Sequence, residues 1–396
     1  MALERENLRK SLRQLLTSIT FKTTTAGIVA ALFSCTGPPL IIMNSAAAGN
    51  LSTKELTSWI FAVYFFGGVL SLILSLAYRQ PLVGAFSIPG TVFVGISLTQ
   101  ITFSQALGAY IVSGLILLAL GFSGVMEKTM RFLPQPIVMG TIAGTLIHFG
   151  TGVITSAYSA PVLGIGTLLS YFFTQRFLKR VPPILGALVG GLAVILLKGN
   201  YNFEIDLRIM GPSIFYPEFV PKTVLSVSLP LVVLVLGSEN AQAIGVSKAQ
   251  GYNPPVNMIT VLSGLASTIG AFFGAHSVNM AGVSTAICAA PENGDRERRY
   301  TGSIIAGLFF ILFGVFNSIA VSFIKVLPAE FINIIAGLSM IGVLIGAFEL
   351  SFSSKRFRTG AIFSLLIAMS GINIFYVSAP FWSLVGGVLV SYITDL

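Results

Sequence analysis

Long apolar runs follow one another along almost the whole chain, separated by short polar stretches. A helix needs about 20 apolar residues to cross the hydrocarbon core of a bilayer, and most of these runs approach that length. The pattern therefore predicts an all-α polytopic membrane protein with about 14 transmembrane segments. We place them near residues 24–44, 54–78, 83–99, 105–123, 134–153, 159–175, 182–199, 224–247, 254–274, 278–290, 300–325, 328–349, 357–376 and 379–394.

The second half of the chain resembles the first. Ile111–Gly121 (IVSGLILLALG) is similar to Ile304–Gly314 (IIAGLFFILFG), 193 positions later, and Ala85–Ile88 is matched with Ala275–Val278, 190 positions later. Each half contains seven predicted segments, which is an odd number, so the second half must enter the membrane upside down. A 7+7 inverted repeat of this kind is typical of secondary transporters.

The third segment of each half is too short and too polar to form a complete spanning helix. Pro89 and Gly90 interrupt segment 3, and the stretch His276–Gly282 interrupts segment 10. Both patterns predict a short strand that runs into a half-helix beginning near the membrane midplane. Irregular backbone is tolerated at that depth only where it is buried in protein or lines a cavity, so matching interruptions indicate a binding site.

Composition and charge agree with a membrane protein. Apolar residues make up 54% of the 396 positions and charged residues 9%, with a mean hydropathy of +0.88, which excludes an ordinary water-soluble domain. The net charge of +9 does not indicate nucleic acid, because 18 of the 23 Lys and Arg residues fall on one side of the predicted topology. This bias predicts a multi-pass cytoplasmic (inner) membrane protein with both termini in the cytoplasm.

Glu239 is the carboxylate that lies deepest inside an apolar run, within Leu229–Ser247. An ionisable residue at that depth is a candidate for function by default. When protonated it can donate a hydrogen bond to a bound carboxylate, and when ionised it would repel one, so proton and anion would bind together. The alternative is a permanently protonated structural acid. His276 is a second candidate for proton coupling or, equally, a neutral hydrogen-bonding residue.

Two facing half-helix N-termini offer unpaired N–H groups and positive dipole ends, which suit an anion. No Lys or Arg lies deep in a segment, so we expect a small monoanion or a polar neutral molecule as substrate. The sequence shows no catalytic, cofactor-binding or metal-binding motif, and we expect no cofactor and no metal. The candidate substrate-binding residues are Ser87, Pro89, Gly90, Thr91, Glu239, Asn240, His276, Ser277, Asn279, Met280, Ala281 and Gly282.

Three motifs carry a resemblance to a known family. LGSENAQAIGVSKAQGYNPPVN (236–257), GAHSVNMAGVSTAICAAPE (274–292) and SIPGT (87–91) resemble the benzoate/proton symporter family of the BenE type, and the similarity extends over essentially the whole chain. That family is similar in fold to the nucleobase/ascorbate and sulphate-permease transporters. The resemblance implies a core domain (1–123 and 224–325), a gate domain (124–199 and 326–396) and a linker outside the cytoplasm (200–223).

The resemblance also implies a function. We expect proton-coupled uptake of benzoate or a related aromatic carboxylate, with the substrate between half-helices 3 and 10 and segment 8 alongside. A nucleobase or inorganic-anion carrier on the same fold, and an anion channel, remain alternatives, whereas the lack of a catalytic set argues against an enzyme. The expected partners are the aromatic carboxylate, protons and the lipid bilayer, with a homodimer left open and no nucleic acid.

Overall fold

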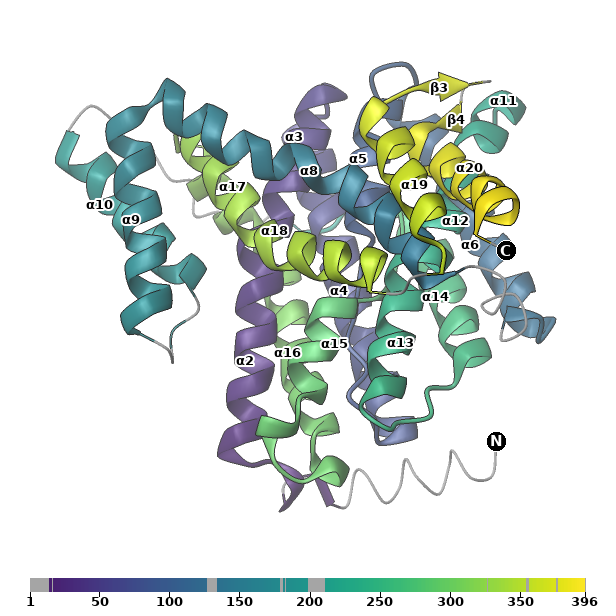
Figure 1. Cartoon of the computed structure of the whole chain (residues 1–396), viewed down its shortest axis with the longest axis horizontal. Helices are drawn as coiled ribbons and strands as arrows, with labels where there is room; N and C mark the ends of the chain where they lie inside the picture. Colours follow the sequence, from purple (N-terminus) through teal and green to yellow (C-terminus); the bar gives the residue numbers. More distant parts are fainter. Residues whose placement is uncertain are drawn as a thin grey trace.

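The computed structural model describes residues 14–15, 17–126, 134–178, 181, 183–198, 211–325, 327–353, 356–374 and 377–395. Figure 1 shows a bundle of helices in which α9 and α10 form a pair at one side, while α19 and α20 lie at the opposite side. Helices α2, α4, α14 and α16 stand side by side between them. The all-α fold expected from the apolar pattern is confirmed.

The first half of the chain contains helices and one short strand. In chain order these are α2 (Phe21–Thr36), α3 (Pro38–Ala48), α4 (Thr53–Tyr78), β1 (Gly84–Ala85), α5 (Ile88–Ser97), α6 (Phe103–Phe122), α8 (Gln135–Ser159), α9 (Pro161–Phe177) and α10 (Pro183–Lys198).

The second half follows the same plan. It contains α11 (Pro221–Thr223), α12 (Leu229–Leu234), α13 (Ala241–Ala249), α14 (Val256–Ala271), β2 (Asn279–Met280), α15 (Gly282–Ala289), α16 (Tyr300–Val315), α17 (Asn317–Lys325), α18 (Ala329–Phe352), α19 (Arg358–Ser370), β3 (Asn373–Ile374), β4 (Val377–Ser378) and α20 (Ala379–Thr394). Two stretches of π-helix, Val224–Ser228 and Val235–Asn240, join α11, α12 and α13 into one continuous segment.

Both predicted interruptions are present as a strand followed by a half-helix. Strands β1 and β2 pair antiparallel, with Gly84 opposite Met280 and Ala85 opposite Asn279. The half-helices α5 and α15 begin at Ile88 and Gly282, which are 194 positions apart. The match of Ala85–Ile88 with Ala275–Val278 is therefore out of register with the elements. Three identical or similar residues in a stretch of four are too few to fix an alignment, whereas the half-helices give an offset of 194 and the strands one of 195.

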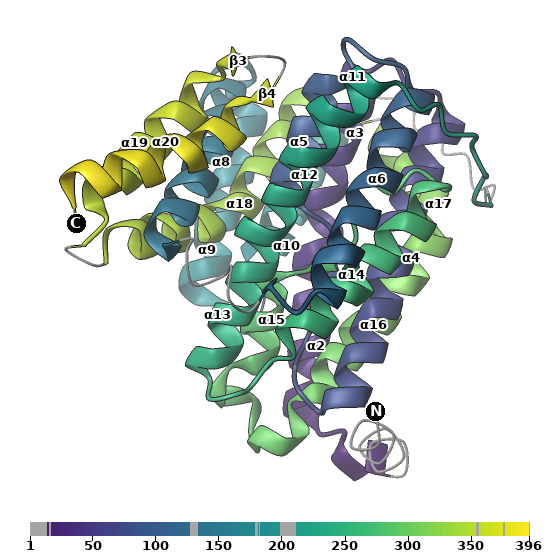
Figure 2. The ribbon, with the colours of Figure 1, turned by 90° about the vertical axis from the view of Figure 1, so that its right-hand side faces the viewer.

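Helices of one half pack on helices of the other, α4 on α16 and α6 on α14 (Figure 2). Glycines allow the backbones of these helices to approach closely. A Cβ added to Gly68 would lie 2.5 Å from the carbonyl oxygen of Gly307, too close for any side chain. A Cβ added to Gly264 would likewise lie 2.5 Å from the backbone nitrogen of Leu118. Such contacts are typical of helix packing in membranes, where van der Waals contact replaces the hydrophobic effect. A two-fold relation between the halves would produce this exchange, in which α4 packs on α16 and α6 packs on α14.

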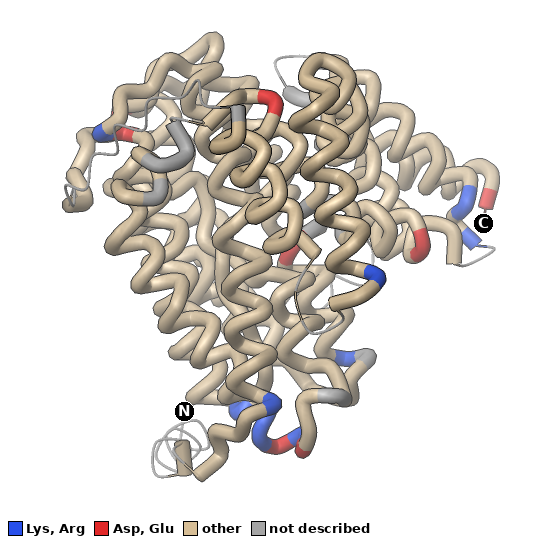
Figure 3. Tube along the Cα trace, turned by 90° about the vertical axis from the view of Figure 1, so that its left-hand side faces the viewer, with Lys and Arg blue, Asp and Glu red and all other residues tan. Residues whose placement is uncertain are grey.

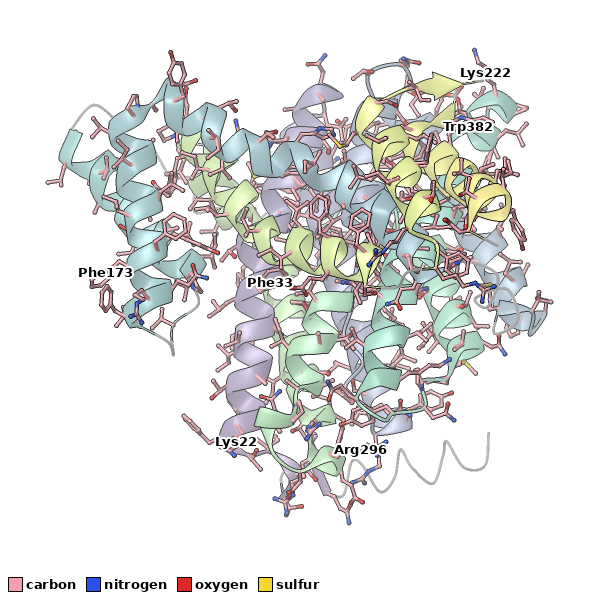
Figure 4. All side chains as sticks on the ribbon, viewed as in Figure 1. Lys22, Phe33, Phe173, Lys222, Arg296 and Trp382 are labelled. Carbon is pink, nitrogen blue, oxygen red and sulfur yellow. The ribbon has the colours of Figure 1, made fainter. Side chains whose placement is uncertain are left out.

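Helices lie in each predicted apolar range, although their lengths differ. Within the described residues, six helical stretches are long and apolar enough to cross a membrane: Phe21–Ala48, Thr53–Tyr78, Phe103–Phe122, Gln135–Ser159, Pro221–Lys248 and Arg296–Val315. Other helices, such as α5 and α15, are too short to cross it alone, so the count of 14 crossings remains a prediction. Charged residues lie mainly at the ends of the bundle and in the loops (Figure 3). Lys22 and Arg296 lie at one end and Lys222 at the other (Figure 4).

Residues 211–220 form an extended strap across three helix ends. The Ser58 hydroxyl on α4 donates to the Ser213 carbonyl at 3.0 Å, and the Phe215 N–H donates to the Phe272 carbonyl after α14 at 2.8 Å. The Glu218 N–H donates to the Ser104 carbonyl on α6 at 2.9 Å. These bonds tie α4, α6 and α14 together. Residues 200–210 of the predicted linker lie outside the described residues.

Candidate substrate-binding site

The antiparallel β1–β2 pair brings the two half-helices to one place in the middle of the bundle. The N-terminus of α5 is largely satisfied by its own chain, because the Ser87 hydroxyl accepts a hydrogen bond from the Gly90 N–H at 3.0 Å. Pro89 has no N–H to offer, and the Ile88 N–H points to Glu239 Oε1 at 3.4 Å. The expectation of unpaired N–H groups at both half-helix N-termini is therefore not met at Gly90.

The N-terminus of α15 differs, because no side chain caps it. Its Gly282 N–H donates a hydrogen bond to the Glu239 carboxylate. A single carboxylate thus accepts hydrogen bonds from the first residues of both half-helices, where the helix dipoles are positive. Glu239 reaches this point from the π-helical stretch Val235–Asn240, and such π-bulges are frequent at functional sites.

A cavity opens beside Glu239. Its volume is about 40 Å³, and its walls are mainly apolar. Among the described residues that line it, none is a Lys or Arg, and the only ionisable side chain is that of Glu239. The lining residues are Phe33, Ser34, Pro38, Ala85, Phe86, Ile88, Ile142, Leu146, Glu239, Gln242, Ala281, Gly282, Val283 and Ser284.

His276 is completely buried and hydrogen-bonded at both ring nitrogens. The Trp59 Nε1–H lies 3.0 Å from Nδ1 and can only donate, so Nδ1 accepts and carries no proton. Nε2 then carries the proton and lies 3.0 Å from the Ser87 carbonyl oxygen and 3.1 Å from Thr91 Oγ1. A second proton on the ring would place an N–H against the Trp59 N–H. This geometry fits a neutral imidazole that holds the start of α5.

The remaining polar candidates bond to the strands and to one another. Asn240 Oδ1 accepts from the Met280 N–H at 2.8 Å, and Ser277 Oγ accepts from the Ser87 N–H at 3.1 Å. Asn279 donates through Nδ2 to the Met280 carbonyl at 3.0 Å. These side chains therefore fix the position of β2 relative to its neighbours, and they leave the cavity wall to other residues.

Of the predicted site residues, Glu239, Ala281 and Gly282 line the cavity. Ser87, Pro89, Gly90, Thr91, Asn240, His276, Ser277, Asn279 and Met280 lie around it without lining it. The other lining residues, among them Gln242, Phe33 and Ser284, were not among the predicted site residues. Gln242 follows Glu239 by three residues, the spacing of neighbours on one helix face, and this signal was available. Phe33 carries no such signal, because it is one of 31 phenylalanines.

The chain matches known proteins over almost its full length. A family model described as benzoate membrane transport protein (BenE) matches residues 17–393. The "Benzoate membrane transport protein" of Acinetobacter baylyi is 30% identical over 372 residues, covering 93% of this chain and 94% of that protein. "Inner membrane protein YdcO" of Escherichia coli is 29% identical over 372 residues, covering 93% and 95%.

Solved structures share the fold at low sequence identity. The transmembrane domain of a cyanobacterium bicarbonate transporter, BicA, superposes with a TM-score of 0.60 at 15% identity, covering 94% of this chain and 98% of that one. The structure of SLC26A9 gives a TM-score of 0.59 at 16% identity, covering 97% and 67%. At this identity the similarity concerns the fold alone.

Proposed function

Because this chain belongs to the benzoate membrane transport family, we propose that it is a proton-coupled symporter that imports benzoate or a related aromatic carboxylate by alternating access. As a member of that family it is a multi-pass membrane transporter and not an enzyme. The observation that carries the proposal is the Glu239 carboxylate between two half-helix N-termini, at the wall of an apolar cavity.

Proton coupling follows from competition for the same hydrogen-bond donors. The ionised Glu239 carboxylate accepts from the Ile88 and Gly282 N–H groups, which are the donors that a substrate carboxylate would need. Protonation removes the charge of Glu239 and turns one of its oxygens into a donor. The N–H groups then become available to a second anion. An anion would therefore bind well only to the protonated carrier, and the two would cross together.

The cavity walls support an aromatic monoanion. Phe33 and Phe86 offer aromatic faces or edges, and Ile142, Leu146 and Val283 complete an apolar slot for a ring. The polar side chains that line it are those of Ser34, Glu239, Gln242 and Ser284. The lack of Lys and Arg among the described lining residues argues against a doubly charged substrate such as a phosphate ester.

Alternating access requires two bodies that move relative to each other. We propose that 1–123 and 224–325 form the core, with 124–199 and 326–396 as the gate. Most of one buried apolar cluster comes from the first pair of ranges, and two smaller clusters come mostly from the second pair. The cavity is lined by both, since Ile142 and Leu146 lie on α8 and the other lining residues on the proposed core. A sliding of α8 past the half-helices would open the cavity to one side at a time.

Purified protein in proteoliposomes tests this function. An inwardly directed proton gradient at zero membrane potential should drive accumulation of radiolabelled benzoate above its external concentration, and preloaded benzoate should drive counterflow. An excess of unlabelled benzoate should compete, whereas uracil and sulphate should not. Flux that follows only the benzoate gradient, without saturation or counterflow, would identify an anion channel and contradict the symporter.

A further inference from the structure

Gln242 lies in the first turn of α13 and its side chain lies flat against the start of α15. A Cβ added to Gly282 would be 2.2 Å from Gln242 Oε1, 2.4 Å from Cδ and 2.6 Å from Cγ. The amide therefore occupies the space that any side chain at position 282 would take. Gly282 is needed here because its missing Cβ allows the Gln242 amide to reach the uncapped turn.

The amide of Gln242 is available for a ligand. Within the part of the chain that the structure describes, neither its nitrogen nor its oxygen has a hydrogen-bond partner, and the residue is half-buried at the wall of the cavity that Glu239 also lines. Asn240, two residues earlier, has its Oδ1 committed to the Met280 N–H. Asn240 Nδ2 is buried without a hydrogen-bond partner, but Asn240 does not line the cavity, whereas Gln242 does.

We propose that Gln242 determines specificity for carboxylates, with its amide N–H donating to the carboxylate of the bound aromatic acid. The proton on Glu239 and the first N–H groups of α15 provide the other donors, so both carboxylate oxygens are satisfied without a basic residue. A neutral amide also adds no charge that would hold the anion too tightly for release. This inference rests on the proposed function, because it assigns the substrate headgroup a position in that same site.

Equilibrium binding of radiolabelled benzoate to the purified protein in detergent tests the role of Gln242. Gln242→Met keeps the length of the side chain and removes its donors, so we expect benzoate to bind about tenfold or more weakly. Gln250→Met is the matched control, because Gln250 follows the last turn of the same helix and does not line the cavity. The control should bind benzoate as the wild type does.

A second variant gives an independent result. Gln242→Glu keeps the shape but places a second carboxylate beside Glu239, so benzoate binding should be lost at neutral pH and recover as the pH falls. Equal affinity of wild type and Gln242→Met, or full binding by Gln242→Glu at neutral pH, would overturn the role of Gln242. A wild-type protein that binds no benzoate would instead contradict the proposed substrate, so the two failures are distinguishable.

Discussion

Glu239 and His276 are neighbours at the same site, but their partners allow them different chemistry. The Glu239 carboxylate lines a cavity and accepts bonds that a ligand could replace. The His276 ring is enclosed, and each of its nitrogens already has a partner from a different element. We therefore propose that Glu239 carries the coupled proton and that His276 has a positioning role. Two substitutions separate these roles.

Glu239→Gln imitates the protonated state, because the amide has the same size and can donate a hydrogen bond but cannot release a proton. Benzoate binding should survive with a weaker pH dependence, and counterflow should persist, whereas accumulation driven by a proton gradient should fall to passive equilibration. Both fluxes are measured in the same vesicles. Glu349→Gln, an exposed carboxylate on α18, is the control. Wild-type accumulation by Glu239→Gln would show that another group carries the proton.

Trp59→Phe retains an aromatic ring but removes the N–H that His276 Nδ1 accepts. An unsatisfied buried acceptor costs about 1–3 kcal/mol, so thermal unfolding should occur at a lower temperature. The pH profile of benzoate uptake should keep its midpoint, because His276 does not carry the coupled proton in this account. A displaced midpoint in Trp59→Phe would contradict the positioning role and favour His276 as the proton carrier.

At the scale of elements, the site depends on how closely the strand β1 approaches α4. A Cβ added to Gly67 would lie 2.8 Å from Ala85 Cα, and one added to Gly84 would lie 2.6 Å from the Gly67 carbonyl oxygen. Ser71 Oγ on the same helix also accepts a hydrogen bond from the Gly84 N–H at 2.7 Å. The strand thus lies directly against the helix backbone, and it positions the first residue of α5 three positions later.

Gly67→Leu should push β1 away from α4 and so move the Ile88 N–H out of reach of Glu239. Overpacking of this kind costs about 1–3 kcal/mol, which a bundle of this size should survive, while benzoate binding should be lost. Gly152→Leu on α8 is the matched control, since a Cβ there has no neighbour within 4 Å. Size-exclusion profiles and benzoate affinity of both variants provide the measurement. If Gly67→Leu binds benzoate as tightly as the wild type, the close contact between β1 and α4 is not needed for the binding site.

At the scale of the whole molecule, the orientation in the membrane is the main untested prediction. The basic loops predict that Arg298 faces the cytoplasm and that the strap 211–220, with Tyr216 86% exposed, faces the other side. In a variant lacking Cys35 and Cys288, an impermeant maleimide added to intact cells should label Tyr216→Cys, and should label Arg298→Cys only after permeabilisation. The reverse pattern would invert the topology.

The amino-acid sequence by itself determined the membrane class, the positions of the apolar segments and the two interruptions. Each of these depends on local composition: run length fixes whether a helix can cross a bilayer, and Pro89, which is tolerated only in the first turn of a helix, marks the start of a new, short helix. It also indicated Glu239, because a carboxylate inside an apolar run is costly in a membrane and can be recognised from the sequence without knowing its neighbours. The strands and half-helices that these signals predicted are present.

Only the tertiary structure decided which side chains line the cavity. Asn240 and Gln242 are chemically alike and two residues apart, but the π-helical stretch before α13 directs one to β2 and the other to the cavity. Phe33 and Leu146 reach the same wall from helices more than 100 positions apart, and the Ser87 cap uses the donor that Gly90 was expected to offer. Such outcomes depend on helix rotation and on competition between nearby donors and acceptors. Neither is encoded in local composition, because both are decided when distant segments pack.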